Sequence, residues 1–115
     1  MFALRWLNEA AETYAQLRAA AEQATANRAA SGRTKSGRGE GLFKQVHKTV
    51  RLLCENPRHP SLQTHEYDDL EHPYDNTQKV FEAYAQNNTP GAYRIFWCYG
   101  PNKGEITILA ISSHP

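Results

Sequence analysis

Arg94 is the residue whose chemistry conflicts most clearly with its surroundings. It lies in the run Gly-Ala-Tyr-Arg-Ile-Phe-Trp-Cys-Tyr of residues 91–99, in which both alternating faces are otherwise largely apolar. A guanidinium cannot lose its charge and is costly to bury alone. We therefore expect Arg94 to have an acidic partner or to open onto a cleft where an anion binds. Glu82 lies inside another apolar run, residues 79–86, and is a natural ion-pair partner if the two runs are neighbouring strands.

Histidines and carboxylates are concentrated between residues 57 and 76. The segment holds His59, His65 and His72 together with five acidic residues. The spacings of the three histidines match no tight ligand pair, and no HExxH motif places two imidazoles on one helix face. We expect an ordered surface loop with turns at its prolines. We predict neither a metal site nor a cofactor.

Positive charge gathers in one stretch of the chain. Seven cations stand against the single acid Glu40, and they are Arg28, Arg33, Lys35, Arg38, Lys44, Lys48 and Arg51. A local positive field attracts phosphates and acidic protein segments alike. These seven residues are therefore candidate nucleic-acid-binding residues, with a merely solvated basic linker as the alternative. The spacing of a nucleotide-binding P-loop is absent, so the stretch does not predict ATP or GTP binding.

Length and composition limit the class of protein. The chain has 115 residues and a formal net charge of +1, which predicts a single domain, residues 1–115, with one modest core. Cys54 and Cys98 lie far apart inside apolar patterns, which favours small buried side chains in a reducing compartment. The opening apolar run is too short for a signal peptide, and no apolar segment has the length of a membrane-spanning helix. We expect a soluble cytoplasmic protein.

Periodicity predicts the elements that position these residues. Residues 2–7 alternate in hydrophobicity as in a short strand, and Asn8 is the predicted N-cap of a helix that runs to about residue 30. Residues 31–41 hold four glycines and three cations without periodicity, which predicts a flexible basic loop. A second helix follows and ends before Pro57, because the residue before a proline is pushed out of the helical region.

The C-terminal third predicts a sheet. Two runs rich in β-branched and aromatic residues, 91–99 and 105–114, flank a turn-forming cluster and predict a hairpin, with residues 79–86 as a further strand. The predicted class is α+β: an N-terminal strand, then two helices packed on one face of a mainly antiparallel sheet that ends in this hairpin. The acidic, histidine-rich residues 64–76 form an insert between the second predicted helix and the strand of residues 79–86.

Five residue runs, together with this order of elements, resemble the RelE/ParE superfamily of type II toxin–antitoxin toxins. They are Phe-Ala-Leu-Arg-Trp-Leu-Asn-Glu at 2–9, Glu-Asn-Pro-Arg-His-Pro-Ser-Leu at 55–62, Phe-Glu-Ala-Tyr at 81–84, Tyr-Arg-Ile-Phe-Trp at 93–97 and Ile-Leu-Ala-Ile-Ser-Ser-His at 108–114. The resemblance spans nearly the whole chain, and the Tyr-Arg strand with the last strand and its histidine is its more specific part. It implies a RelE-like fold.

The resemblance also implies a bacterial, metal-independent endoribonuclease that cuts mRNA, often on the ribosome, and that an antitoxin holds in check. Arg94 matches the arginine that stabilises phosphate charge in nuclease members while the 2′-oxygen attacks. His114 matches an acid/base histidine that follows the last strand in several members. Imidazole and guanidinium suit proton transfer and dianion stabilisation near neutral pH.

Hairpin geometry limits what Arg94 and His114 do together. If Tyr99 lies opposite Glu105, then Arg94 lies opposite Ala110, and an extended His114 stands about four positions away, or roughly 13 Å. The two side chains would then contact neighbouring parts of an RNA strand rather than one phosphate. A catalytic group from elsewhere is needed, and the candidates are His65, Tyr67 and Glu82.

The family's C-terminal extension, which often carries further arginine, lysine or tyrosine groups, has no counterpart after Pro115. Two main classes of function therefore stay open. One is a ribonuclease toxin. The other is a protein that keeps the fold but only binds an antitoxin-like partner, RNA or DNA gyrase. A metal- or small-molecule-binding protein is a third class, and none of the three involves a membrane.

Overall fold

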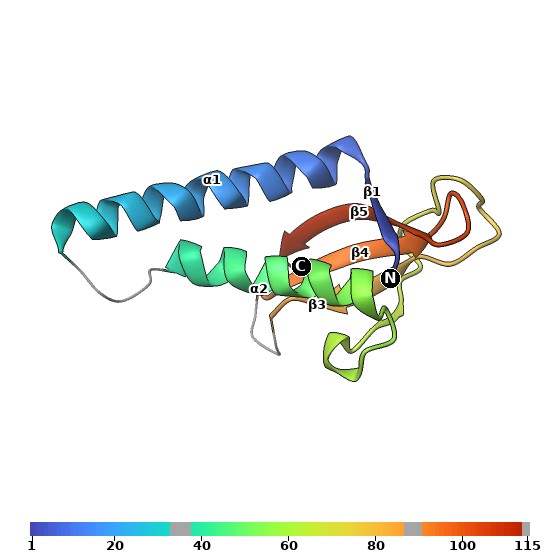
Figure 1. Ribbon diagram of the computed structural model, residues 1–115. Coiled ribbons are helices and arrows are strands. Elements are labelled where there is room, and N and C mark those ends of the chain that lie inside the picture. Colours follow the sequence, from blue (N-terminus) through green and yellow to red (C-terminus); the bar gives the residue numbers. More distant parts are fainter. Residues whose placement is uncertain (33–37, 87–90, 114–115) are drawn as a thin grey trace.

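The computed structural model describes residues 1–32, 38–86 and 91–113, which form a five-stranded sheet and two long helices (Figure 1). The elements in chain order are β1 (Ala3–Trp6), α1 (Asn8–Ser31), α2 (Arg38–Glu55), the 3-10 helix η1 (Pro60–Leu62), β2 (His65–Glu66), β3 (Phe81–Tyr84), β4 (Tyr93–Tyr99) and β5 (Glu105–Ser113). Neither helix in these ranges is long and apolar enough to cross a membrane.

The sheet has the order β1-β5-β4-β3-β2. β1 runs parallel to β5, and every other neighbouring pair of these strands is antiparallel. The two helices run side by side on one side of the sheet, with α2 across β4 in the view of Figure 1. The predicted α+β class, with two helices on one face of a mainly antiparallel sheet that ends in a hairpin, is confirmed.

The start of α1 differs from the prediction at one position. Leu7 is the N-cap, without a side-chain cap hydrogen bond, and Asn8 is already helical. The reason is that the Leu7 amide donates to the Ile108 carbonyl at 3.0 Å, which keeps the backbone extended through residue 7. The helix ends at Gly32, whose φ of 74° lies in the left-handed region that glycine adopts without strain.

The predicted loop 31–41 is too long at both ends. Ser31 is the last residue of α1, and α2 already begins at Arg38, while residues 33–37 lie outside the described part of the chain. Glu40 in the first turn of α2 accepts a two-pronged hydrogen bond from Arg28 of α1, with the Nη2–Oε2 distance at 2.8 Å. This buried ion pair and the favourable position of an anion near a helix N-terminus explain why α2 forms across its two glycines.

The core has two layers because β4 is buried on both faces, as predicted. On the helix side, Ile95 and Trp97 of β4 pack with Val46 and Leu53 of α2. On the other side, a smaller apolar cluster consists of Val80, Phe96, Cys98 and Leu109, with Leu7, Tyr67 and Ala110 packed against it. The helices therefore bury one face of the sheet, and the second face has only this small cluster.

The hairpin register differs from the predicted one. Tyr99 lies opposite Ile106, and an irregularity between Phe96 and Trp97 leaves Arg94 opposite Ser112 rather than Ala110. A β-bulge adds one residue to one strand and shifts all later pairs, and a hydrophobicity pattern cannot show this when both faces are apolar.

His72 fixes the insert of residues 64–76 to the hairpin. The side chain is 5% exposed, and its Nδ1 accepts hydrogen bonds from the amides of Tyr74 at 3.2 Å and Asp75 at 3.1 Å. Because Nδ1 accepts, Nε2 carries the proton and donates to the Tyr99 carbonyl at 2.7 Å. One neutral imidazole thus satisfies three backbone groups.

We expect His72→Ala to lower the free energy of unfolding by about 1–3 kcal/mol, because three partly buried backbone groups lose their partner. Urea denaturation measures this change, and limited proteolysis should show earlier cleavage between residues 67 and 79. The neighbouring Glu71 is exposed, so Glu71→Ala is the control and should stay within about 0.5 kcal/mol of the parent. Equal stability of the two variants would contradict the role given to His72.

Candidate active site

Arg94 lies on the sheet face that the helices leave uncovered, which we name the open face. Successive residues of a strand point to opposite faces of the sheet. Ile95 and Trp97 belong to the core on the helix side, so Arg94 points to the other side, together with Phe96 and Cys98. Only 6% of Arg94 is exposed. This cation is therefore buried within β4.

The Arg94 guanidinium is fixed by a ring and a carbonyl. Its central carbon lies 3.8 Å from the centroid of the Tyr84 ring, and Nη1 donates to the Ala92 carbonyl at 3.1 Å. An arginine stacked on an aromatic face keeps its donors pointing outward in the ring plane. Nε is buried and has no partner among the described residues. A permanent cation with a spare buried donor is suited to binding an anion.

Glu82 and His65 form an ion pair on the same face. β2 pairs with β3 so that His65 lies directly opposite Glu82, and their Nε2 and Oε1 atoms are 2.7 Å apart. Glu82 is 1% exposed, whereas about half of the His65 side chain is exposed. The second carboxylate oxygen, Oε2, is buried and lacks a partner among the described residues.

His65 lies between two oxygen acceptors. Its Nδ1 is 3.2 Å from the Gln63 carbonyl, and its Nε2 is 2.7 Å from Glu82 Oε1. An imidazolium would donate to both oxygens, whereas a neutral imidazole donates to one of them. Imidazole and carboxylate are the two side-chain types that act most often as general acid or base.

Glu82 is not the ion-pair partner of Arg94, so that expectation is wrong. The register places Tyr84 opposite Arg94 and Phe96 opposite Glu82, and among the described residues no salt bridge joins Arg94 to Glu82. The two charges occupy diagonal positions on neighbouring strands, which are typically about 7–8 Å apart. Among the described residues each has one buried atom without a partner, and a phosphate group between them would give the Arg94 Nε an acceptor.

Two further side chains complete the open face. Tyr67 packs on Phe96 with ring centroids 4.6 Å apart, next to the Glu82 position. Ser112 lies opposite Arg94 and is exposed. Tyr67 was a candidate third catalytic group, and the structure instead gives it a packing role in the small apolar cluster.

Cys98 shares this face but cannot act as a nucleophile near neutral pH. Burial raises the pKa of its thiol to about 11, against a smaller lowering effect of the Thr107 backbone. The thiolate is the reactive form of cysteine, so a thiol with this pKa is inert under ordinary conditions. The chemistry of the open face therefore rests on Arg94, Glu82 and His65.

The predicted nucleic-acid-binding residues do not converge on this face. Arg28 is held by Glu40, Arg33 and Lys35 lie outside the described residues, and the side chain of Arg38 is not described. Lys44, Lys48 and Arg51 are exposed on α2, with Arg51 Nη2 at 3.6 Å from Glu55 Oε1. We name these three the α2 cations. They lie on the helix side of the sheet, away from Arg94.

His114 lies outside the described residues, so its acid/base role stays a prediction. Sequence reasoning missed Tyr84, which supports the Arg94 guanidinium. It also missed the pairing of His65 with Glu82, although it named both residues. The spacing Glu-Ala-Tyr indicates that residues 82 and 84 share a face, but only the strand order shows what lies opposite. Within the described ranges, no three His, Cys, Asp or Glu side chains are grouped to hold a metal ion.

The chain has the fold of the RelE/ParE-like toxins, as its similarity to solved structures shows. This confirms, at the level of the fold, the resemblance inferred from the sequence. No protein-family model matches the sequence, and no curated protein matches it either. The likeness is therefore carried by solved structures alone.

Three solved toxin structures illustrate the likeness. A YoeB/ParE toxin from Agrobacterium tumefaciens has a TM-score of 0.62 at 6% identity, covering 98% of this chain and 99% of that one. A YoeB dimer from Staphylococcus aureus has a TM-score of 0.56 at 10% identity, covering 99% and 98%. The toxin–antitoxin complex RelBE of E. coli gives 0.55 at 10% identity, covering 100% and 99%. Identities this low show a shared fold, and activity must be argued from the site.

We expect Cys98 to resist alkylation by iodoacetamide at pH 8 in the folded protein. Its thiol pKa of about 11 leaves roughly a 100-fold smaller thiolate fraction than an ordinary cysteine has. Intact-mass measurement should show at most one adduct, on the half-buried Cys54, and two adducts after unfolding in urea. Cys54→Ser is the control and should leave the folded protein unmodified. Rapid labelling of Cys98 in that variant would show that the open face admits reagents to the thiol.

Proposed function

We propose that this chain is a toxin of the type II toxin–antitoxin kind that cleaves mRNA as a metal-independent endoribonuclease. One observation carries the proposal. The hydrogen-bonded pair of Glu82 and His65 lies on the same open face as the buried cation Arg94, and Glu82 and Arg94 each have one buried polar atom without a partner among the described residues. Cleavage of RNA by its own 2′-oxygen needs a proton acceptor, a proton donor and a cation on the phosphate.

The proposed reaction assigns these tasks to named atoms. Glu82, as the carboxylate of its ion pair with His65, accepts the proton of the 2′-hydroxyl while the 2′-oxygen bonds to phosphorus. Arg94 stabilises the extra negative charge on the phosphate oxygens through its free Nε–H and guanidinium charge. The bond from phosphorus to the 5′-oxygen breaks, and His114, two residues beyond Ser112 in the sequence, gives that oxygen a proton. The products are a 2′,3′-cyclic phosphate and a 5′-hydroxyl.

Two structural features support catalysis over simple binding. Stacking on Tyr84 holds the guanidinium in place before substrate arrives, so no reorganisation is needed when charge develops. The strand pairing of His65 with Glu82 likewise sets their 2.7 Å contact on rigid backbone. A protein that only binds through the open face has no need for an imidazole held against a buried carboxylate.

The proposed setting of this activity is a bacterial cytoplasm in which an antitoxin-like protein restrains the enzyme. The support is the fold shared with the RelBE structure, which is a complex of toxin and antitoxin. The α2 cations are proposed to hold the RNA backbone, or the RNA of a ribosome, beyond the reacting nucleotides. Their distance from the open face suits this auxiliary role rather than contact with the scissile phosphate.

We expect Arg94→Ala to slow RNA cleavage by the purified protein by about 100- to 1000-fold, because charge on the phosphate is no longer stabilised. Glu82→Gln keeps the shape of the side chain but removes the proton acceptor, and should cost at least about 100-fold. Mapping of RNA ends with single-turnover kinetics, in buffer containing EDTA, measures both. The matched control is Arg18→Ala, which removes an exposed arginine of α1 and should cleave at the parental rate.

Undiminished cleavage by Arg94→Ala would show that the site lies elsewhere. No cleavage by the parent protein, with growth arrest still seen on expression, would favour the alternative of a binding protein that acts on a partner or on DNA gyrase. Thermal denaturation of each variant separates loss of catalysis from loss of the fold.

We expect the double variant Lys44→Ala, Lys48→Ala to weaken RNA binding and to reduce its salt dependence. Each phosphate contact to single-stranded RNA contributes roughly 0.7 to the slope of log affinity against log salt, so the slope should fall by about 1.4. Filter binding between low and moderate salt measures it, with the cleavage-deficient Glu82→Gln as background. The control Lys79→Ala, Lys103→Ala makes the same change in net charge. Equal salt-dependence slopes for the two double variants would show that the α2 cations do not contact the RNA.

A further inference from the structure

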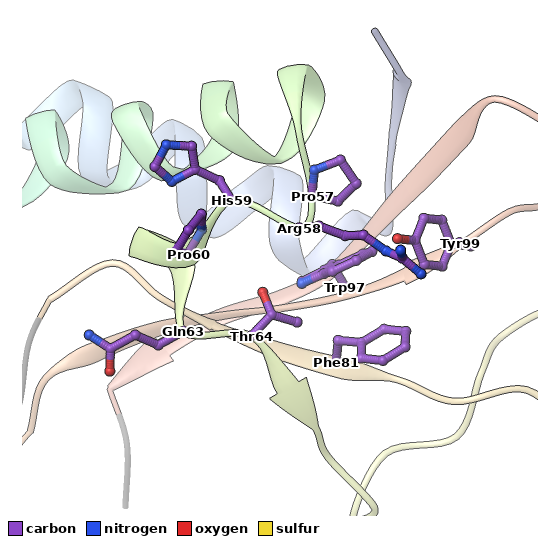
Figure 2. Close-up of a pocket in the computed structure, with 9 residues that line it drawn as sticks. All are labelled: Pro57, Arg58, His59, Pro60, Gln63, Thr64, Phe81, Trp97 and Tyr99. Carbon is purple, nitrogen blue, oxygen red and sulfur yellow. The ribbon is translucent and has the colours of Figure 1, made fainter.

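A separate pocket lies on the helix side of the sheet, opposite the open face (Figure 2). It has a volume of about 440 Å³ and forms where the segment that follows α2 crosses β3 and β4. Phe81, Trp97 and Tyr99 supply its aromatic side. Residues 57–64, with η1, supply the other wall. Its size is in the range of pockets that hold small molecules.

The pocket contains two buried polar atoms that lack partners among the described residues. Trp97 is 1% exposed, yet its indole Nε1–H donates to none of the described residues. The Thr64 hydroxyl, on the opposite wall, is also buried without a partner. A buried indole N–H almost always finds an acceptor, so its isolation indicates an acceptor that a ligand supplies.

The charge of the lining points to an anion. Among the described residues no carboxylate lines the pocket, whereas Arg58 is exposed and extends along the mouth toward Tyr99 (Figure 2). His59 also lines the pocket, and its Nδ1 accepts from the Ser61 amide at 3.1 Å, which leaves Nε2 as a donor. The lining thus carries positive charge at its edge, and aromatic rings with the Trp97 and Thr64 polar atoms inside.

The rings favour a flat ligand. Phe81 and Tyr99 are both partly exposed and stand nearly perpendicular to each other, with an interplanar angle of 79° and centroids 5.9 Å apart. Trp97 lies beneath them, tilted by 30° against Phe81. Such an arrangement presents an aromatic face to a planar group, and stacking of a nucleobase on aromatic side chains is largely independent of base identity.

We propose that this pocket binds one nucleoside monophosphate unit. The base lies against Phe81 and Tyr99, and an acceptor in its ring plane takes the hydrogen of Trp97 Nε1. The phosphate lies on Arg58 at the mouth. All four common bases carry an in-plane acceptor, and Thr64 can either donate or accept, so the pocket does not select one base.

The ligand has two possible sources with the same chemistry: a free mononucleotide, or a single nucleotide turned out of an RNA strand. The inference does not depend on the proposed catalysis, because the two sites occupy opposite faces of the sheet. They meet only at Gln63, which lines the pocket and whose carbonyl contacts His65. An acidic peptide with an aromatic side chain is the competing class of ligand, but it is disfavoured because a free peptide loses more conformational freedom than a rigid base on entering so small a pocket.

Nitrogen-15 NMR of the full chain tests the proposal directly. The protein has two tryptophans, so the indole Nε1–H signal of Trp97 has that of Trp6 as an internal reference. Titration with UMP, AMP, GMP and CMP should move the Trp97 signal and leave that of Trp6 in place. A single-stranded RNA hexamer is titrated against Arg94→Ala, which cannot cleave it by the mechanism proposed above.

Two variants separate the contacts. Trp97→Phe keeps a ring but removes the donor, and should weaken mononucleotide binding roughly tenfold, measured by calorimetry. Arg58→Gln should weaken the monophosphates roughly tenfold and leave the nucleosides unchanged, because only the phosphate contact is lost. Arg18→Gln is the matched control and should bind as the parent does.

The outcomes are distinct. A Trp97 shift with mononucleotides supports a free ligand, and a shift with the RNA hexamer alone supports a nucleotide of an RNA strand. If neither moves the signal at millimolar concentration, the proposal is overturned. It is also overturned if only a capped Glu-Phe dipeptide moves the signal, which would assign the pocket to a protein partner. Because the signal is read without cleavage, failure of the catalytic proposal leaves these results unchanged.

Discussion

A permanent positive charge is built into the most buried strand of this sheet, and the rest of the open face follows from it. Arg94 stands in β4 with only 6% of its surface exposed. A guanidinium cannot be neutralised by deprotonation, so the fold must compensate it by geometry. The Tyr84 ring and the Ala92 carbonyl provide part of that compensation, but the carboxylate nearest in the register, Glu82, is committed to His65. Among the described residues, the Arg94 guanidinium thus has no carboxylate partner, and its Nε has no hydrogen-bond acceptor.

The separation of Arg94 from Glu82 leaves both charged groups of the open face available to interact with a ligand. Had the two formed a salt bridge, both charges would be satisfied and the face would be inert. Instead, each keeps one buried atom without a partner among the described residues, and His65 lies 2.7 Å from the other oxygen of the Glu82 carboxylate. Partly satisfied buried polar groups are costly to keep, which is why they are concentrated at sites where a ligand completes them.

The sheet also divides the molecule into two chemical halves. The helix side carries the α2 cations and the aromatic pocket of Trp97, and the open side carries Arg94 and the Glu82–His65 pair. The three toxin structures described above share 6–10% identity with this chain over nearly its full length. An architecture that keeps one sheet face covered by two helices tolerates such divergence, because it constrains which positions are apolar and not which residues fill them.

The sequence by itself determined the α+β class, the approximate limits of both helices and the burial of a cation in β4, because these follow from local periodicity, proline and the charge of one residue. It also named His65 and Glu82 as candidates. Only the tertiary structure decided that they pair with each other, that Tyr84 supports Arg94 and that Ser112 lies opposite it. The reason is physical: strand order and register join residues far apart in sequence. With both faces of β4 apolar, no alternation marks the irregularity between Phe96 and Trp97 that shifts the whole end of the hairpin.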